Sequence, residues 1–131
     1  MNGSLMNSVS IVAAVVVAAM CLFQILLAMG LPLGHAAFGG SDRVLPKKLR
    51  YASAMTVFVF LAALFVILAG GGFLGEANKS SSLARIGIWV LVVVFGVSTL
   101  ANISSMSRWE RYLMAPVGLV LTLCCVTLGL S

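Results

Sequence analysis

Four polar side chains interrupt long apolar stretches of this sequence and are the first candidates for chemistry. Gln24 lies in one stretch, and Ser98, Asn102 and Ser105 lie in another. The last three are spaced four and three residues apart, so they share one face of a helix. Such side chains either bond neighbouring helices to one another or line a wet vestibule that receives a polar group. The residues alone leave both interpretations open.

A second set of residues combines charge with hydrogen-bonding capacity near the ends of the apolar stretches. This candidate ligand-binding group consists of His35, Arg43, Arg50, Asn102, Arg108 and Glu110. The arginines of this set suit an anion or a lipid headgroup. His35, the sole histidine, would suit an interfacial enzyme if it met Glu110 or Asp42 beneath an open pocket. We predict that the six residues converge at one membrane end of the protein.

Motifs of the common enzyme and metal sites are missing from the sequence. It contains no nucleophile paired with a base, no phosphate-binding loop, no haem-binding pair and no zinc motif. Cys21, Cys124 and Cys125 lie in apolar stretches without CxxC spacing. Adjacent residues point about 100° apart on a helix, so Cys124 and Cys125 do not form one compact metal site. We therefore assign no catalytic residue, no metal and no cofactor, and we favour a protein that is not an enzyme.

The elements that must position these residues are four apolar runs, at about 9–29, 52–70, 86–106 and 113–130. The 131-residue chain is 62% hydrophobic and only 8% charged, whereas a soluble domain has roughly 25% charged residues. Each run is long enough to cross the hydrocarbon core as a helix, and none alternates as the strands of a membrane barrel do. We predict an all-α fold: a membrane-embedded four-helix bundle with short loops, formed by residues 1–131 as a single transmembrane domain.

Local signals place the ends of these helices. Pro46 suits the first turn of the second helix, and Gly70 to Gly72 should end it. Ser80 to Ser82 offer N-cap candidates before the third helix, and Pro116 falls in the first turn of the fourth. The first run has no basic residue before it and is too long for a signal peptide, so we expect a retained helix.

Basic residues predict how the chain lies in the membrane. Six of them fall in the first and third loops, namely Arg43, Lys47, Lys48, Arg50, Arg108 and Arg111, against Lys79 and Arg85 on the other side. The positive-inside rule then puts both termini outside the cytoplasm.

The net charge of +5 forms no patch or stripe, so we expect no nucleic acid partner. No charged side chain lies deep in a run, which argues against proton antiport.

Two segments carry a resemblance to known sequences. These are Gly30-x-Pro32-x-Gly34-x-Ala36-Ala37-x-Gly39-Gly40 followed by Leu45-Pro46-x-x-x-Arg50, and Asn102-x-x-Ser105-x-Ser107-x-x-Glu110-Arg111. Both resemble a group of small four-helix bacterial integral membrane proteins of unknown function, over nearly the whole chain. The resemblance implies a multi-pass protein of the bacterial plasma (inner) membrane, and it transfers no activity.

Three functions follow as hypotheses. The first is binding or transport of a small or amphipathic ligand near the cytoplasmic mouth, and its mark would be a cavity lined by Gln24, Ser98 and Asn102. The second is a structural or regulatory subunit of a larger membrane complex, with Gln24 and Asn102 bonded to each other. The third is an interfacial enzyme acting on a lipid-like substrate. The partners we expect are the lipid bilayer, a second copy in a homo-oligomer, or another membrane protein.

Overall fold

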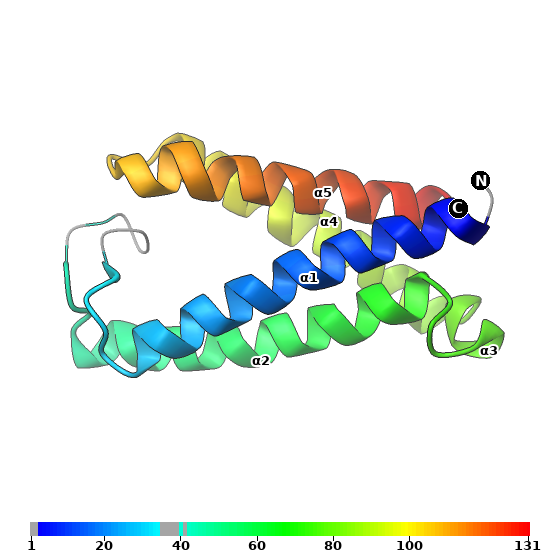
Figure 1. Cartoon of the computed structure of the whole chain (residues 1–131), viewed down its shortest axis with the longest axis horizontal. Coiled ribbons are helices and arrows are strands. Elements are labelled where there is room, and N and C mark those ends of the chain that lie inside the picture. The colour runs from blue at the N-terminus through cyan, green and yellow to red at the C-terminus, as the bar shows by residue number, and fades with distance from the viewer. Residues whose placement is uncertain (1–2, 35–39, 41) are drawn as a thin grey trace.

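The structure, a computed structural model, is all-α over the residues that it describes, which are 3–34, 40 and 42–131. Its elements in chain order are α1 (Gly3–Ala28), α2 (Lys47–Gly70), α3 (Glu76–Lys79), α4 (Ser82–Ile103), the π-helical turn η3 (Glu110–Met114) and α5 (Ala115–Leu130). The turn η3 runs directly into α5, and the two together form one long helix (Figure 1). With α1, α2 and α4, the described chain thus has four long helices. The predicted all-α four-helix arrangement is confirmed.

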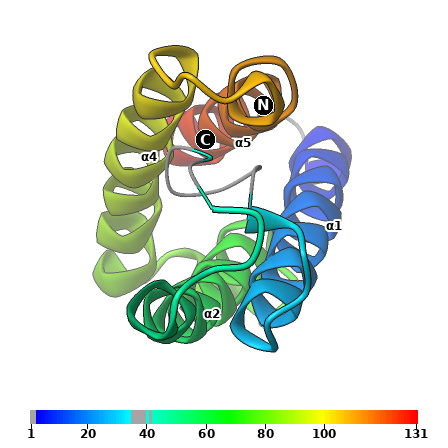
Figure 2. The same ribbon diagram turned by 90° about the vertical axis from the view of Figure 1, so that its left-hand side faces the viewer.

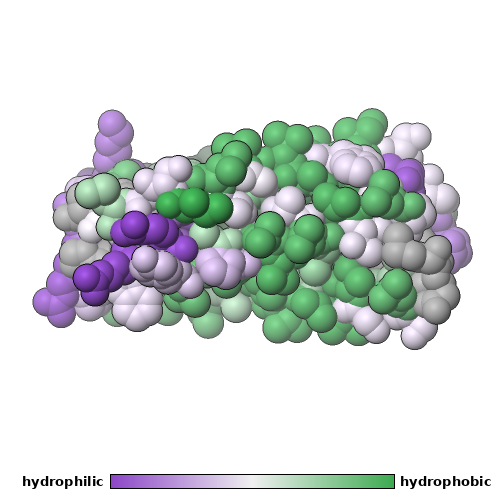
Figure 3. All heavy atoms as spheres, turned by 90° about the horizontal axis from the view of Figure 1, so that it is seen from above, coloured by the Kyte–Doolittle hydropathy of each residue, from purple (hydrophilic) through white to green (hydrophobic). Residues whose placement is uncertain are grey.

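The four long helices make this chain a multi-pass membrane protein. Each is long and apolar enough to cross a bilayer, and the fourth spans Glu110–Leu130. Large apolar side chains such as Val15, Phe58 and Val93 are more than half exposed, as expected of residues that face lipid. On the face shown in Figure 3, hydrophobic residues cover the middle of the molecule, whereas hydrophilic ones gather toward its two ends.

The helices begin and end where local chemistry requires. Pro46, in an extended conformation, is the N-cap of α2, and Gly71 follows its last residue. Ser81 is the N-cap of α4, and its hydroxyl oxygen accepts a hydrogen bond of 3.1 Å from the Ala84 amide. The helices extend beyond the predicted runs, since α1 starts at Gly3 and the last helix reaches back to Glu110. A helix continues into the interface wherever its end groups find water or a cap.

Two helical hairpins form the bundle. Helix α1 packs along α2, α4 packs along α5, and weaker contacts join α1 to α5 and α2 to α4. Seen from the end that carries the 29–46 loop, the helices follow one another around a ring in chain order (Figure 2). Both chain termini lie at the opposite end (Figure 1). An even number of spans brings the termini to one side, and the two basic loops to the other.

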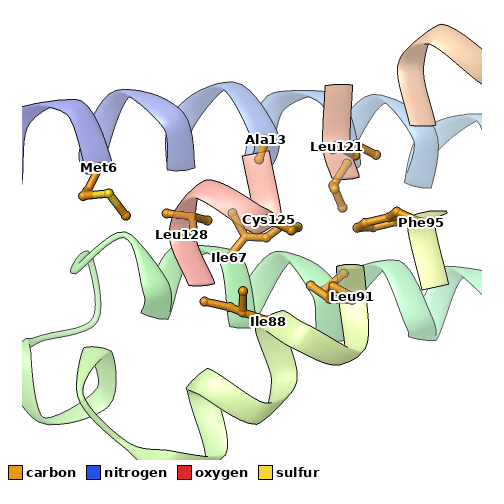
Figure 4. Close-up of a cluster of buried hydrophobic side chains, with 11 residues drawn as sticks. Met6, Ala13, Ile67, Ile88, Leu91, Phe95, Leu121, Cys125 and Leu128 are labelled. Carbon is orange, nitrogen blue, oxygen red and sulfur yellow. The ribbon is translucent and has the colours of Figure 1, made fainter. Parts of the chain in front are cut away.

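The hydrophobic core fills the half of the bundle near the termini. Figure 4 shows buried side chains that run from Met6 and Leu128 at one end to Phe95 and Leu121 at the other. The hairpins approach each other closely here, because an added Cβ on Gly70 would collide with Ile88 of α4. Small residues let membrane helices come together in this way. The core therefore closes one half of the bundle.

The first loop is fastened to the other end of the bundle. Leu45 is buried against Leu27 at the end of α1. The Gly34 amide donates a 2.7 Å hydrogen bond to the carbonyl of Arg43, which brings both ends of residues 34–43 together. Arg50 of α2 donates from Nε to the carbonyl of Ala28 at 3.0 Å, so its positive charge lies at the negative end of the α1 dipole. The described ends of the loop are thus held at the end of the bundle where α1 ends and α2 begins.

Candidate functional site

The half of the bundle that the core leaves open contains a pocket of about 520 Å³. All four long helices contribute to it. We call it the bundle pocket; its lining consists of Met20, Phe23 and Gln24 of α1, Thr56, Val59 and Phe60 of α2, Val94, Phe95, Ser98, Ala101 and Asn102 of α4, Ser105 and Met106 of the following turn, and Glu110, Met114, Val117, Gly118 and Leu121 of the last helix. Both hairpins contribute to this lining, and their ribbons diverge toward the end that carries the first loop (Figure 1).

An aromatic pair marks the inner end of the bundle pocket. The rings of Phe60 and Phe95 stack with centroids 6.4 Å apart and planes inclined by 15°. Phe95 and Leu121 belong both to the pocket lining and to the core cluster. The bundle pocket therefore ends where the close-packed core begins, and its inner part offers a ligand only apolar contacts.

The polar residues expected inside the membrane all line this pocket. Gln24 faces it from α1, while Ser98, Asn102 and Ser105 face it from α4 and the turn after it. Gln24 Oε1 is buried and has no hydrogen-bond partner among the described residues. A structural subunit was expected to have a hydrogen bond between Gln24 and Asn102. No such bond is present among the described residues. The polar faces of two hairpins thus meet around an open space.

Among the described residues that line the pocket, Glu110 is the charged one. It is only 6% exposed and begins the π-helical turn η3. The Ser107 hydroxyl accepts a 3.4 Å hydrogen bond from the Glu110 amide, in the first turn of a helical segment that begins at Arg108. The expectation that the fourth apolar run begins at Leu113 thus places the start of this segment too late, since the membrane-spanning helix includes Glu110. Because Glu110 belongs to the helix and not to the preceding loop, its side chain lies in the pocket lining.

The π-helical turn lies directly before a proline. Pro116 has no amide hydrogen, so it cannot bond back to the carbonyl four residues earlier, at Tyr112. The Ala115 amide donates to the carbonyl of Glu110, five residues earlier, which widens the turn by one residue. Such bulges are frequent at functional sites. Here the wider turn lies beside the pocket and carries both Glu110 and Met114 into its lining.

The predicted ligand-binding group is divided by the structure. Asn102 and Glu110 line the bundle pocket. Arg50 lies near the same end, but its side chain bonds to the end of α1. Arg43 and Arg108 are exposed in the loops at this end. His35 lies outside the described residues, so the convergence of all six remains a prediction.

Several lining residues escaped prediction from the sequence. The aromatic wall of Phe23, Phe60 and Phe95 is indistinguishable in the sequence from other apolar residues. Gly118 also lines the pocket, because it allows α5 to approach Thr99 of α4 closely. A glycine in the middle of an apolar run is a usable signal for such an approach.

Within the described ranges, no three His, Cys, Asp or Glu side chains come close enough to hold a metal ion. A comparison of the chain with protein families, with curated proteins and with solved structures found no match. The bundle pocket is therefore the basis for assigning a function.

Proposed function

We propose that this protein binds a small, largely apolar ligand with a polar group in the bundle pocket. The observation that carries the proposal is a space of about 520 Å³ with an apolar inner end and a polar mouth. Pockets for small ligands have volumes of roughly 300–1,000 Å³, apolar walls and a few polar groups that fix orientation. The bundle pocket has each of these features.

The polar groups of the lining support a ligand that forms hydrogen bonds. A buried amide without a partner costs about 1–3 kcal/mol, which a ligand hydrogen bond would recover. The Gln24 amide oxygen is such a group, and Asn102 and Ser105 lie on the facing hairpin. A ligand bonded to both sides would also hold the two hairpins together.

The proposal places the pocket mouth in the cytoplasmic leaflet of a bacterial plasma membrane. Its basis is the excess of Lys and Arg in the two loops at that end, together with the positive-inside rule. Transport through the bundle would require the Phe60–Phe95 pair and the core beyond it to separate. We therefore propose binding as the basic activity. Assembly with a second copy or with another membrane protein stays a prediction.

Photolabelling tests the proposal. The protein is reconstituted in lipid nanodiscs, exposed to a water-soluble, diazirine-bearing short-chain alcohol, irradiated and digested for mass spectrometry. We expect adducts on Leu121, which is 2% exposed and therefore reachable only through the pocket. The variant Ala101→Phe fills the pocket from α4, whereas Leu100→Phe adds a ring on a neighbouring, lipid-facing position.

The expected result is a loss of about tenfold in Leu121 labelling with Ala101→Phe, equivalent to ~1.4 kcal/mol of binding free energy. Leu100→Phe should label as the unaltered protein does. Unchanged labelling in Ala101→Phe, or adducts confined to lipid-facing residues in every sample, would refute binding in this pocket.

A further inference from the structure

The lining of the bundle pocket is not equally covered on all sides. Its most exposed members lie on α2 and α4 and in the turn that follows α4; these are Val59, Val94, Ser98, Ala101 and Met106. The members from α1 and α5 are buried or half-buried. The pocket is therefore open on the side where α2 and α4 face each other.

The contacts between α2 and α4 explain this opening. They lie in the half of the bundle near the termini, where Gly70 meets Ile88, Val66 meets Gly87 and Phe60 stacks on Phe95. Toward the end that carries the first loop, α2 and α4 separate. There α4 lies beside the last helix, while α2 lies beside α1 (Figure 1). A gap between these helices thus leads from the outer surface into the pocket.

The gap lies within the hydrocarbon region of a bilayer. Val59 follows the start of α2 by twelve residues, which is about 18 Å along the helix axis. Val94 precedes the end of α4 by nine residues, or about 14 Å. Both distances reach roughly the middle of a hydrocarbon core about 30 Å thick. Lipid chains, rather than water, therefore face the opening.

We infer that the ligand is an amphiphile that enters sideways from the bilayer, through the gap between α2 and α4. This inference rests on the proposed function and adds the class of ligand and its route. The apolar tail lies against Phe60, Phe95 and Leu121, and the polar head lies at the loop end of the pocket. That arrangement matches the bilayer, where heads also lie at the interface.

An unpartnered acceptor near the head favours a ligand with a hydrogen-bond donor. Gln24 Oε1 is buried, lacks a partner in the described structure and belongs to the pocket lining. A hydroxyl or ammonium head can donate a hydrogen bond to it, whereas an ionised carboxylate head only accepts hydrogen bonds. The ligand class is thus a long-chain alcohol or amine rather than a fatty acid.

Three photoreactive probes test this inference in nanodiscs. They share one long alkyl chain with a diazirine near its end and differ only in the head, which is an alcohol, an amine or a carboxylate. Because such chains reside in the bilayer, adducts on Leu121 report entry from the membrane. We expect the alcohol and the amine to label Leu121 at least about tenfold more than the carboxylate, a difference of ~1.4 kcal/mol.

Matched variants test the route. Val59→Trp places a large ring in the gap, while Phe58→Trp changes the neighbouring residue, which is 66% exposed and does not line the pocket. We expect Val59→Trp to reduce long-chain labelling of Leu121 by about tenfold and Phe58→Trp to leave it unchanged. Equal labelling in the two variants would refute the lateral route, and a preference for the carboxylate would refute the ligand class.

The short-chain alcohol separates these failures from that of the proposed function. If it labels Leu121 while no long-chain probe does, the pocket binds ligands but the bilayer does not supply them, and the inference is wrong. If neither kind of probe labels Leu121, both the inference and the proposed function are wrong.

Discussion

A single methyl group at Gly118 should disturb the close contact between α5 and Thr99 of α4. An ideal Cβ at this position would lie 2.5 Å from Oγ1 of Thr99 and 3.6 Å from its Cα. Thr99 is buried, and its hydroxyl donates a 2.7 Å hydrogen bond to the Phe95 carbonyl. Rotation of the Thr99 side chain would relieve the collision but break that bond, since the other contacts, with its Cβ at 3.5 Å and its Cα at 3.6 Å, are of ordinary van der Waals length. The substitution Gly118→Ala therefore either costs that hydrogen bond or moves α5 away from α4.

The size of the effect follows from two opposing terms. Replacing glycine by alanine inside a helix stabilises it by about 0.8–1.0 kcal/mol. Overpacking a close contact costs about 1–3 kcal/mol. Gly96 of α4 supplies the control, since an added Cβ there would meet only Thr122 Cγ2 at 4.0 Å, an ordinary contact. The difference in unfolding free energy between Gly118→Ala and Gly96→Ala should thus be about 1–3 kcal/mol.

Reversible unfolding in mixed micelles, followed by circular dichroism as the fraction of denaturing detergent rises, measures this difference. Thr99→Ala removes the atom that the new methyl group would strike. In that background, Gly118→Ala should lose most of its cost, which gives a coupling free energy of about 0.5–3 kcal/mol in a double-mutant cycle. Equal stabilities of Gly118→Ala and Gly96→Ala, or a coupling near zero, would refute the close approach of α4 and α5 at this point.

Two further substitutions test the loop end and the pocket. Arg50→Ala removes the hydrogen bond to the Ala28 carbonyl and the favourable dipole term, so unfolding free energy should fall by about 1–2 kcal/mol. Lys48→Ala, at an exposed position two residues away, should change it by less than about 0.5 kcal/mol, and equal effects would contradict the capping role. Gln24→Leu removes the unpartnered buried amide, so it should stabilise the ligand-free protein by about 1 kcal/mol while weakening the short-chain alcohol labelling of Leu121. A loss of stability with unchanged labelling would show that Gln24 acts as a structural residue.

The helices were largely predictable because their determinants are local. Four apolar runs, an N-cap serine at Ser81 and the proline at Pro46 each act within a few residues of the feature they set. The start of the last helix was predicted too late, at Leu113 instead of Glu110. Hydropathy alone places a charged residue outside a span, whereas the cap at Ser107 and the packing of the bundle bring Glu110 inside.

The candidate site was predictable only in part. The spacing of Ser98, Asn102 and Ser105 places them on one helix face, and all three line the bundle pocket. Arg50 shows the limit of this reasoning, because it lies at the predicted end but bonds to a helix terminus. Charge and position in a sequence do not reveal which acceptor an arginine reaches.

The sequence by itself determined three properties: the chain lies in a membrane, it forms four long helices, and its intramembrane polar residues gather near one end of the bundle. These properties follow from apolar length and from spacing along one helix, which need no knowledge of neighbours. Only the tertiary structure decided that the hairpins pack tightly near the termini and diverge at the loop end, with a pocket open between α2 and α4. The physical reason is that crossing angles and close approaches depend on which small residues of two helices meet, such as Gly118 and Thr99.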